Sequence, residues 1–131
     1  MISPFVKEVR KQGLKLGFYY SLLDWSHPDY PNMTRTEVRY TNDSVRWKRF
    51  VNFNMAQLAE LNKTWKPDLY WFDGDWEQTA EAWNSKGIVD LLRSDNKNVI
   101  INRVSRDMEI MLRRSREFLL YVRKINIGSC V

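Results

Sequence analysis

The order of helical and strand-like segments predicts an α/β fold with a parallel sheet flanked by helices. Amphipathic helical segments alternate with short apolar runs along the chain. Those runs are almost continuously apolar, which is typical of strands buried on both faces. A chain of 131 residues, 44% hydrophobic and 14% aromatic, is also large enough for one packed domain.

The first half of the chain is predicted to hold a helix, a strand, a loop and a second helix. The apolar side chains of residues 5–9 fall on one helical face, and Gly13 is a stop signal. Residues 14–21 (LKLGFYYS) are predicted to form a buried strand. After a polar loop, Ser44 is the predicted N-cap of a helix whose apolar residues recur at helical spacing to Leu61.

The second half is predicted to continue the alternation. Pro67 ends the second helix, and residues 69–73 (LYWFD) read as a second strand. Apolar residues between 83 and 92 predict a third helix, and residues 99–102 (VIIN) a third strand. We expect the three strands to be parallel and adjacent in chain order.

Polar and aromatic residues follow each predicted strand: Tyr20 and Ser21, Asp73 and Gly74, Asn102 and Arg103. Active sites lie at the carboxyl ends of the strands in a (β/α)₈ barrel and in a doubly wound sheet alike, so periodicity leaves these two architectures undecided. No glycine-rich phosphate loop favours a nucleotide-binding fold.

The segment 67–77 (PDLYWFDGDWE) carries the chemistry. An apolar strand ends at Asp73, Gly74 permits a tight exit, and Trp71 and Trp76 flank the carboxylate. Retaining glycosidases attack the anomeric carbon with a fixed carboxylate, and aromatic faces suit the C–H surfaces of a sugar. From the residues alone, the alternative is a strand end capped by acidic residues with the tryptophans in the core.

This segment resembles the nucleophile motif of the retaining α-L-fucosidases of glycoside hydrolase family 29. Residues 13–25 (GLKLGFYYSLLDW), followed by His27 and Pro28, resemble the family's preceding strand and loop. Residues 101–103 (INR) resemble a later strand of the family, without the Asp that many members insert there. The resemblance covers roughly residues 4–105 and implies a partial (β/α)₈ TIM barrel.

The resemblance also implies the roles of four residues. Asp73 would be the catalytic nucleophile and Tyr20 would line the fucose pocket. Trp71 would contact the sugar, and Arg103 would hydrogen-bond or orient near the nucleophile. The family does not use the positions of Asp75 and Glu77 as acid/base, and we interpret both as loop carboxylates. The implied substrate is a fucosylated glycan or glycoconjugate.

Other ligands and partners are expected to be absent. His27 is the single histidine, more typical of a loop residue than of a ligand, and no cysteine pair accompanies it, so we expect no metal and no cofactor. Residues 1–102 hold 14 basic and 13 acidic residues, a balance that argues against nucleic acid as a partner. No apolar run approaches the length of a membrane span.

The compartment is left open by the sequence. No signal peptide is visible at the start of the chain. Three Asn-x-Ser/Thr triplets begin at Asn32, Asn42 and Asn62, which would fit a secretory route or arise by chance.

Residues 106–131 are interpreted as a tail that does not match the family. Residues 103–131 hold seven basic and three acidic residues, a shift in charge from the rest of the chain. Read one base out of frame, the tail can be decoded to resemble the family's continuation, so a frameshift is one explanation of it. We expect this tail to pack poorly or to form a helix over an open sheet edge, with residues 1–105 as the catalytic fragment.

Two functions remain from the sequence. The first is α-L-fucosidase activity, the hydrolysis of terminal α-L-fucosyl linkages by double displacement. The second is a catalytically incomplete fragment with no turnover, because the family's acid/base segment is not recognisable in the tail.

Overall fold

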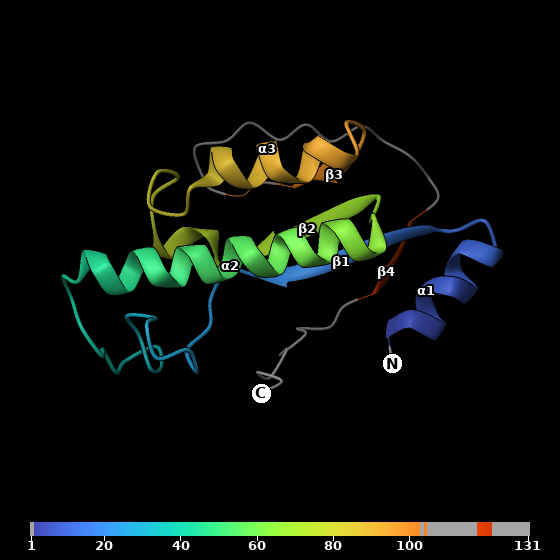
Figure 1. Cartoon of the computed structure of the whole chain (residues 1–131). Helices are drawn as coiled ribbons and strands as arrows, with labels where there is room; N and C mark the ends of the chain where they lie inside the picture. The colour runs from blue at the N-terminus through green and yellow to red at the C-terminus, as the bar shows by residue number, and fades with distance from the viewer. Residues whose placement is uncertain (1, 103, 105–117, 122–131) are drawn as a thin grey trace.

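The computed structural model describes residues 2–102, residue 104 and the strand at 118–121 (Figure 1). No helix in this described part is long and apolar enough to cross a membrane. In chain order the elements are α1 (Ile2–Lys11), β1 (Lys15–Ser21), α2 (Ser44–Trp65), β2 (Leu69–Asp73), the 3₁₀ helix η1 (Asp75–Glu77), α3 (Ser85–Asp95), β3 (Ile100–Ile101) and β4 (Phe118–Tyr121).

The predicted ends of the first two helices are confirmed, with one shift. Gly13 follows α1 at φ 71°, the left-handed conformation that glycine adopts without strain. The N-cap of α2 is Asp43 rather than Ser44, because the Asp43 side chain accepts a hydrogen bond from the backbone N–H of Arg46 at 2.9 Å. Lys66 closes α2 in a left-handed conformation (φ 47°) directly before Pro67.

The strands form an open parallel sheet in the order β3-β2-β1-β4. The predicted adjacency of the first three strands in chain order is therefore confirmed. In the β1–β2 register, Tyr19 lies opposite Trp71 and Ser21 opposite Asp73. The carboxyl ends of these two strands consequently meet at one edge of the sheet.

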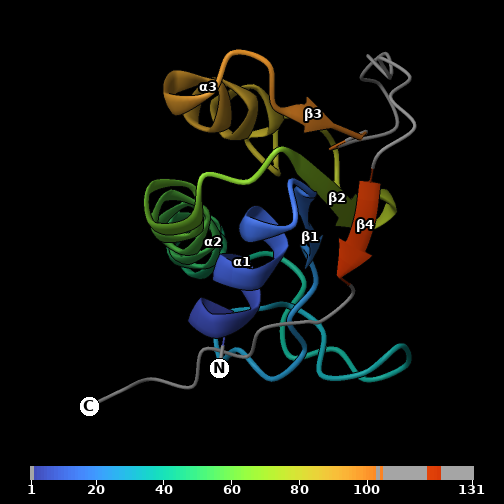
Figure 2. The same ribbon diagram turned by 90° about the vertical axis from the view of Figure 1, so that its right-hand side faces the viewer.

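The helices lie on one side of this sheet, as Figure 2 shows. The sheet face beneath them is apolar, and Leu16 and Phe18 of β1 are almost fully buried with Tyr70 and Phe72 of β2. From the helical side, the core receives Val6 of α1, Phe50, Leu58 and Leu61 of α2, and Ile88 and Leu92 of α3. This packing fixes which side chains of each strand face away from the helices.

For residues 118–121 the expected helix is wrong, whereas the expectation of poor packing stays a prediction. Residues 118–121 form strand β4, which pairs in parallel with β1 so that Lys15 lies opposite Phe118. A helix laid over the edge of β1 would leave the backbone N–H and C=O groups of that edge unpaired, whereas a strand pairs them. The rest of the expectation, on residues 105–117 and 122–131, lies outside the described residues.

Candidate active site

Asp73 is the last residue of β2 and leads into a turn that only glycine accommodates without strain. Gly74 has φ 83°, in the left-handed region. A Cβ atom at this position would lie 2.3 Å from Cγ of Leu23, which follows β1. The tight exit predicted from the sequence is confirmed, and it turns the chain sharply at the carboxylate.

Tyr19 is the nearest polar partner of Asp73 in the described part of the chain. Its hydroxyl donates a hydrogen bond to Oδ2 of Asp73 across the β1–β2 pair. Burial, and then this hydrogen bond and the negative charge of Asp73, raise the pKa of Tyr19 to about 12. Tyr19 is therefore a neutral hydrogen-bond donor near neutral pH, able to hold the carboxylate in one orientation.

Tyr20 does not join this group, although it lies at the same end of the sheet. Its hydroxyl contacts Oε1 of Gln57 at 2.8 Å and Oδ1 of Asn54 at 3.2 Å, and both partners belong to α2. Successive side chains of a strand point to opposite faces, so Tyr20 points toward the helices and Tyr19 toward Asp73. The structure thus places the adjacent tyrosine, not Tyr20, beside the carboxylate.

Trp71 shares the Asp73 face of the sheet, two residues before it on β2. Its side chain is 44% exposed, and Trp76, in the turn after Asp73, is 54% exposed. Neither tryptophan is part of the core, so the alternative interpretation of them as core residues is wrong. Exposed indole rings close to a carboxylate in the sequence offer apolar surfaces against which a sugar ring can pack.

Arg103 lies outside the described residues, but its neighbour Asn102 is fixed at the end of β3. Nδ2 of Asn102 donates to the carbonyl oxygen of Phe72 at 2.8 Å, and its Oδ1 accepts from the N–H of Phe72 at 2.6 Å. This two-bond contact ties the end of β3 to the residue before Asp73.

The two acidic residues after Asp73 are held by the protein. Asp75 is only 6% exposed. Glu77 accepts hydrogen bonds from the hydroxyl of Tyr30 and from Nδ2 of Asn32, the second at 3.2 Å. Glu77 therefore joins the β2–α3 segment to the loop after β1, a structural role consistent with its interpretation as a loop carboxylate.

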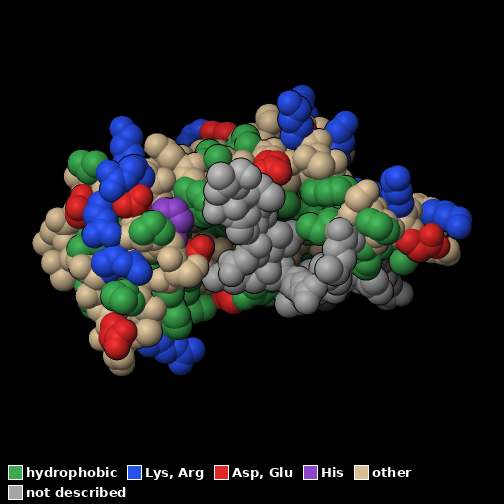
Figure 3. All heavy atoms as spheres, turned by 60° about the horizontal axis from the view of Figure 1, so that its bottom comes forward, with side chains coloured by type: hydrophobic (Ala, Val, Ile, Leu, Met, Phe, Trp, Pro, Cys, Tyr) green, Lys and Arg blue, Asp and Glu red, His purple; other side chains and the backbone are tan. Residues whose placement is uncertain are grey.

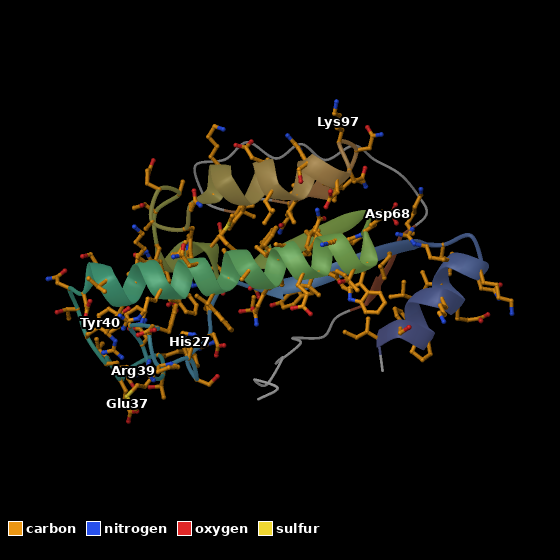
Figure 4. The ribbon with its side chains drawn as sticks, in the orientation of Figure 1. His27, Glu37, Arg39, Tyr40, Asp68 and Lys97 are labelled. Carbon is orange, nitrogen blue, oxygen red and sulfur yellow. The ribbon has the colours of Figure 1, made fainter. Side chains whose placement is uncertain are left out.

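His27 packs within the loop between β1 and α2 (residues 22–43). Its ring lies 4.5 Å from that of Phe53 and 5.1 Å from that of Phe50, measured between centroids, and its Nδ1 accepts from the N–H of Asp29. Among the described residues, no group of three His, Cys, Asp or Glu side chains could hold a metal ion. Figure 4 shows His27 in this loop with Arg39 and Tyr40, far from Asp68 at the other end of the sheet.

Internal charge pairs hold the β1–α2 loop against α2. Asp29 pairs with Arg49 at 2.7 Å and with Arg46 at 3.4 Å, and these contacts, the Arg49 hydrogen bond first, lower the pKa of Asp29 to about 2. Arg39 donates to the carbonyl oxygens of His27 and Tyr30. In Figure 3, acidic side chains stand among the basic ones at this end of the molecule.

Comparison with known proteins identifies the family. The α-L-fucosidase family model matches residues 1–118. The chain belongs to the α-L-fucosidase family.

Its relatives are much longer proteins. The chain is 37% identical over 105 residues to tissue α-L-fucosidase of Mus musculus, covering 78% of this chain and 22% of the relative. It is 35% identical over 106 residues to tissue α-L-fucosidase of Bos taurus, covering 78% and 21%. The chain also superposes on the crystal structure of a bacterial fucosidase with a TM-score of 0.66 at 30% identity, covering 79% of this chain and 23% of that one. That structure contains a phenyltriazole inhibitor with a dihydroxy-methylpyrrolidine ring. The chain spans about a fifth of the length of these proteins.

Tyr19 is the neighbour of Asp73 that the sequence reasoning missed. Alternate side chains of β1 point to opposite faces of the sheet, and Leu16 and Phe18 point toward the helices. Tyr20 therefore also points toward the helices, and the residue on the Asp73 face is its neighbour, Tyr19. Because both faces of β1 are largely apolar, the alternation in the sequence alone is a weak signal.

Proposed function

We propose that this chain is the part of an α-L-fucosidase catalytic domain that supplies the nucleophile, Asp73. The single observation that carries the proposal is the position of Asp73: a half-buried carboxylate at the carboxyl end of a parallel strand, oriented by Tyr19 and flanked by exposed indole rings. The identities of 35% and 37% to fucosidases across this segment support it.

The proposed architecture is three consecutive strands of a (β/α)₈ barrel. In such a barrel, successive parallel strands are neighbours, helices surround the outside, and the site lies at the carboxyl ends. Strands β1, β2 and β3 are adjacent in chain order, and α2 and α3 pack on the face of β2 that carries Tyr70 and Phe72. Asp73 follows Phe72 and therefore belongs to the opposite face. The Asp73 face would then be the inside of the barrel.

The proposed reaction is a double displacement with retention of configuration. The carboxylate of Asp73 attacks the anomeric carbon, an ester bond to the sugar forms, and the bond to the leaving oxygen breaks as that oxygen takes a proton from a general acid. Water, deprotonated by the same group, then attacks the anomeric carbon and releases fucose and the carboxylate. In this proposal Tyr19 orients Asp73 and Trp71 packs on the sugar. The role of Arg103 near the nucleophile is proposed from the family resemblance.

A second proposal is that the chain alone lacks turnover. A retaining enzyme needs a second carboxyl group about 5 Å from the nucleophile. The acidic residues closest to Asp73 along the chain, Asp75 and Glu77, are respectively buried and hydrogen-bonded to Tyr30 and Asn32. The acid/base therefore belongs to a part of the catalytic domain outside residues 1–105, and we interpret residues 106–131 as not supplying it.

The isolated 131-residue chain tests this second proposal. We expect little hydrolysis of 2′-fucosyllactose, because general acid catalysis typically contributes about 10²- to 10⁴-fold. An aryl α-L-fucoside, whose leaving group needs less protonation, should show at most slow turnover that is lost in Asp73→Ala. The matched control is Asp90→Ala, which removes an exposed carboxylate on α3. Robust turnover of 2′-fucosyllactose, abolished by Asp73→Ala, would show that the chain is a complete enzyme.

A further inference from the structure

A pocket of about 360 Å³ lies outside the site described above, where the segments that leave β1 and β2 meet. Ligand sites in proteins are typically about 300–1,000 Å³, so this one has the size for a small ligand. It is lined by Pro31, Tyr40, Thr41, Asn42, Asp43, Ser44, Trp47 and Gln78.

The two aromatic residues of the pocket have their polar atoms bound to the protein. The hydroxyl of Tyr40 donates to the carbonyl oxygen of Asp29 at 2.6 Å, and Nε1 of Trp47 donates to the carbonyl oxygen of Ala82 at 3.1 Å. The Trp47 ring also packs on that of Trp83, 5.1 Å away between centroids. Both residues are therefore held in place, and a ligand could contact them only through the apolar surfaces of their rings.

The remaining groups of the pocket are neutral or already engaged. The Asp43 carboxylate caps α2 by accepting from the N–H of Arg46, and no Lys or Arg lines the pocket. Within the described part of the chain, the side chains of Thr41, Asn42 and Gln78 make no hydrogen bond. A hydroxyl and two amides are thus available beside two aromatic side chains, which suits the hydroxyl groups and C–H faces of a neutral sugar and not an anion.

The pocket lies at the Asp73 end of the sheet. Gln78 is five residues after Asp73 and directly follows Glu77, whose carboxylate binds Tyr30 and Asn32 and so joins the two segments that form the pocket. Tyr40 lies beside the first turns of α2, as Figure 4 shows, with its ring 4.6 Å below the guanidinium carbon of Arg46.

We propose that this pocket is a subsite for a neutral sugar unit of the glycan whose fucose reacts at Asp73. The identity of that glycan rests on the proposed function, whereas binding of a neutral sugar rests on the pocket alone. The subsite would hold the part of the substrate that remains after fucose has left.

The test is NMR titration of the 131-residue chain with lactose, L-fucose and inorganic phosphate as separate probes. We expect lactose to shift the side-chain amide signals of Asn42 and Gln78 and the indole signal of Trp47, and phosphate to leave them unchanged. Gln78→Ala should weaken lactose binding by about three- to tenfold, the effect of losing one neutral hydrogen bond. Gln12→Ala, on the exposed end of α1, is the matched control and should leave the lactose affinity unchanged.

The outcome is separable from that of the proposed function. Asp73→Ala should keep the lactose shifts, so a fucosidase proposal that fails at Asp73 would leave the subsite intact. The subsite is overturned if lactose leaves the three signals unmoved, if Gln78→Ala and Gln12→Ala bind it equally, or if phosphate produces the same shifts. Shifts of the Trp71 indole by L-fucose, without any lactose effect at Trp47, would overturn the subsite and leave the proposed function standing.

Discussion

The hydrogen bond from Tyr19 to Asp73 is the contact that gives the candidate site its chemistry. Oδ2 of Asp73 accepts from the Tyr19 hydroxyl and Oδ1 accepts from the backbone N–H of Gly74 at 2.9 Å, so both oxygens of the carboxylate are fixed by hydrogen bonds. The two adjacent tyrosines have different partners, because Tyr19 contacts Asp73 whereas Tyr20 contacts α2.

The first prediction concerns the titration of Tyr19. Its pKa is raised from 10.0 to about 12, chiefly by burial and then by Asp73. Because the folded-state pKa lies above the unfolded one, the associated stability is complete below pH 10 and is lost as the pH rises toward 12. Asp73→Asn should lower the Tyr19 pKa but not restore it to 10, since burial remains. Tyrosine ring-carbon NMR shifts measure both values, and a pKa near 10 in the parent chain would contradict the contact.

The second prediction compares two glycines that share a left-handed backbone. Gly13→Ala meets no atom within 4 Å and adds only backbone strain, roughly 1–2 kcal/mol. Gly74→Ala adds the same strain and also drives Cβ to within 2.3 Å of Leu23. We expect the second variant to lose more free energy of unfolding than the first, as measured by urea denaturation. Equal losses would mean that Leu23 moves aside freely and that the turn after Asp73 is not tightly packed.

At the scale of elements, the β1–α2 loop is held by charge pairs centred on Asp29. Its carboxylate binds two arginines from successive turns of α2, and Arg39 donates to carbonyl groups within the loop. This loop lines the proposed sugar subsite and holds Glu77 through Tyr30 and Asn32, so its order bears on both binding regions.

The third prediction concerns the acid stability of this loop. The pKa of Asp29 is lowered from 3.8 to about 2, first by the hydrogen bond from Arg49. Because the folded-state pKa is the lower one, the stabilisation is present above pH 3.8 and is lost as the pH falls toward 2. Arg49→Ala should raise the Asp29 pKa, measured from its carboxyl-carbon NMR shift. Arg35→Ala, an exposed position in the same loop, is the control and should leave that pKa unchanged.

Much of the element order could be predicted from the sequence, because the apolar runs and the stop signals at Gly13 and Pro67 are local features. The cap of α2 was placed one residue late because Asp43 and Ser44 are both good N-cap residues. The direction in which the Tyr19 side chain points depends on which face of β1 the helices cover, and tertiary packing decides this.

The contacts of Asn62 show which of the three Asn-x-Ser/Thr triplets is not accessible for glycosylation in the folded chain. This residue of one Asn-x-Ser/Thr triplet is 2% exposed, and its Nδ2 donates to Oδ2 of Asp95 at 3.0 Å and contacts the carbonyl oxygen of Leu92. Its side chain links α2 to α3, so a glycan on Asn62 is incompatible with this packing. Asn42, by contrast, is exposed.

At the scale of the whole molecule, the edge of β1 that does not pair with β2 has a different neighbour here than it would have in a closed barrel. In a closed barrel, the strand that precedes β1 would occupy this edge. Here β4 pairs along it over four residues, from Lys15 opposite Phe118 to Phe18 opposite Tyr121. The role of β4 could not be predicted from composition, because strand pairing depends on which edge is free in the folded sheet.

The fourth prediction follows from that pairing. A chain truncated after residue 104 would expose the edge of β1, and unpaired parallel edges promote association between chains. We expect the truncated chain to self-associate at concentrations at which the 131-residue chain is a smaller species, as measured by light scattering after size-exclusion chromatography. If truncation changes neither the mass distribution nor the thermal midpoint, β4 contributes nothing to the sheet.

The most direct test of Asp73 as nucleophile places residues 4–102 in a complete barrel, by replacing the matching segment of a full-length relative. The chimera should hydrolyse an aryl α-L-fucoside, and Asp73→Ala should lower its turnover by on the order of 10³-fold or more. Added azide should then restore release of the aryl group and give the β-L-fucosyl azide, because a single displacement inverts the anomeric centre. Asp90→Ala should be as active as the parent chimera. An Asp73→Ala chimera that turns over at the parental rate without azide would contradict the account.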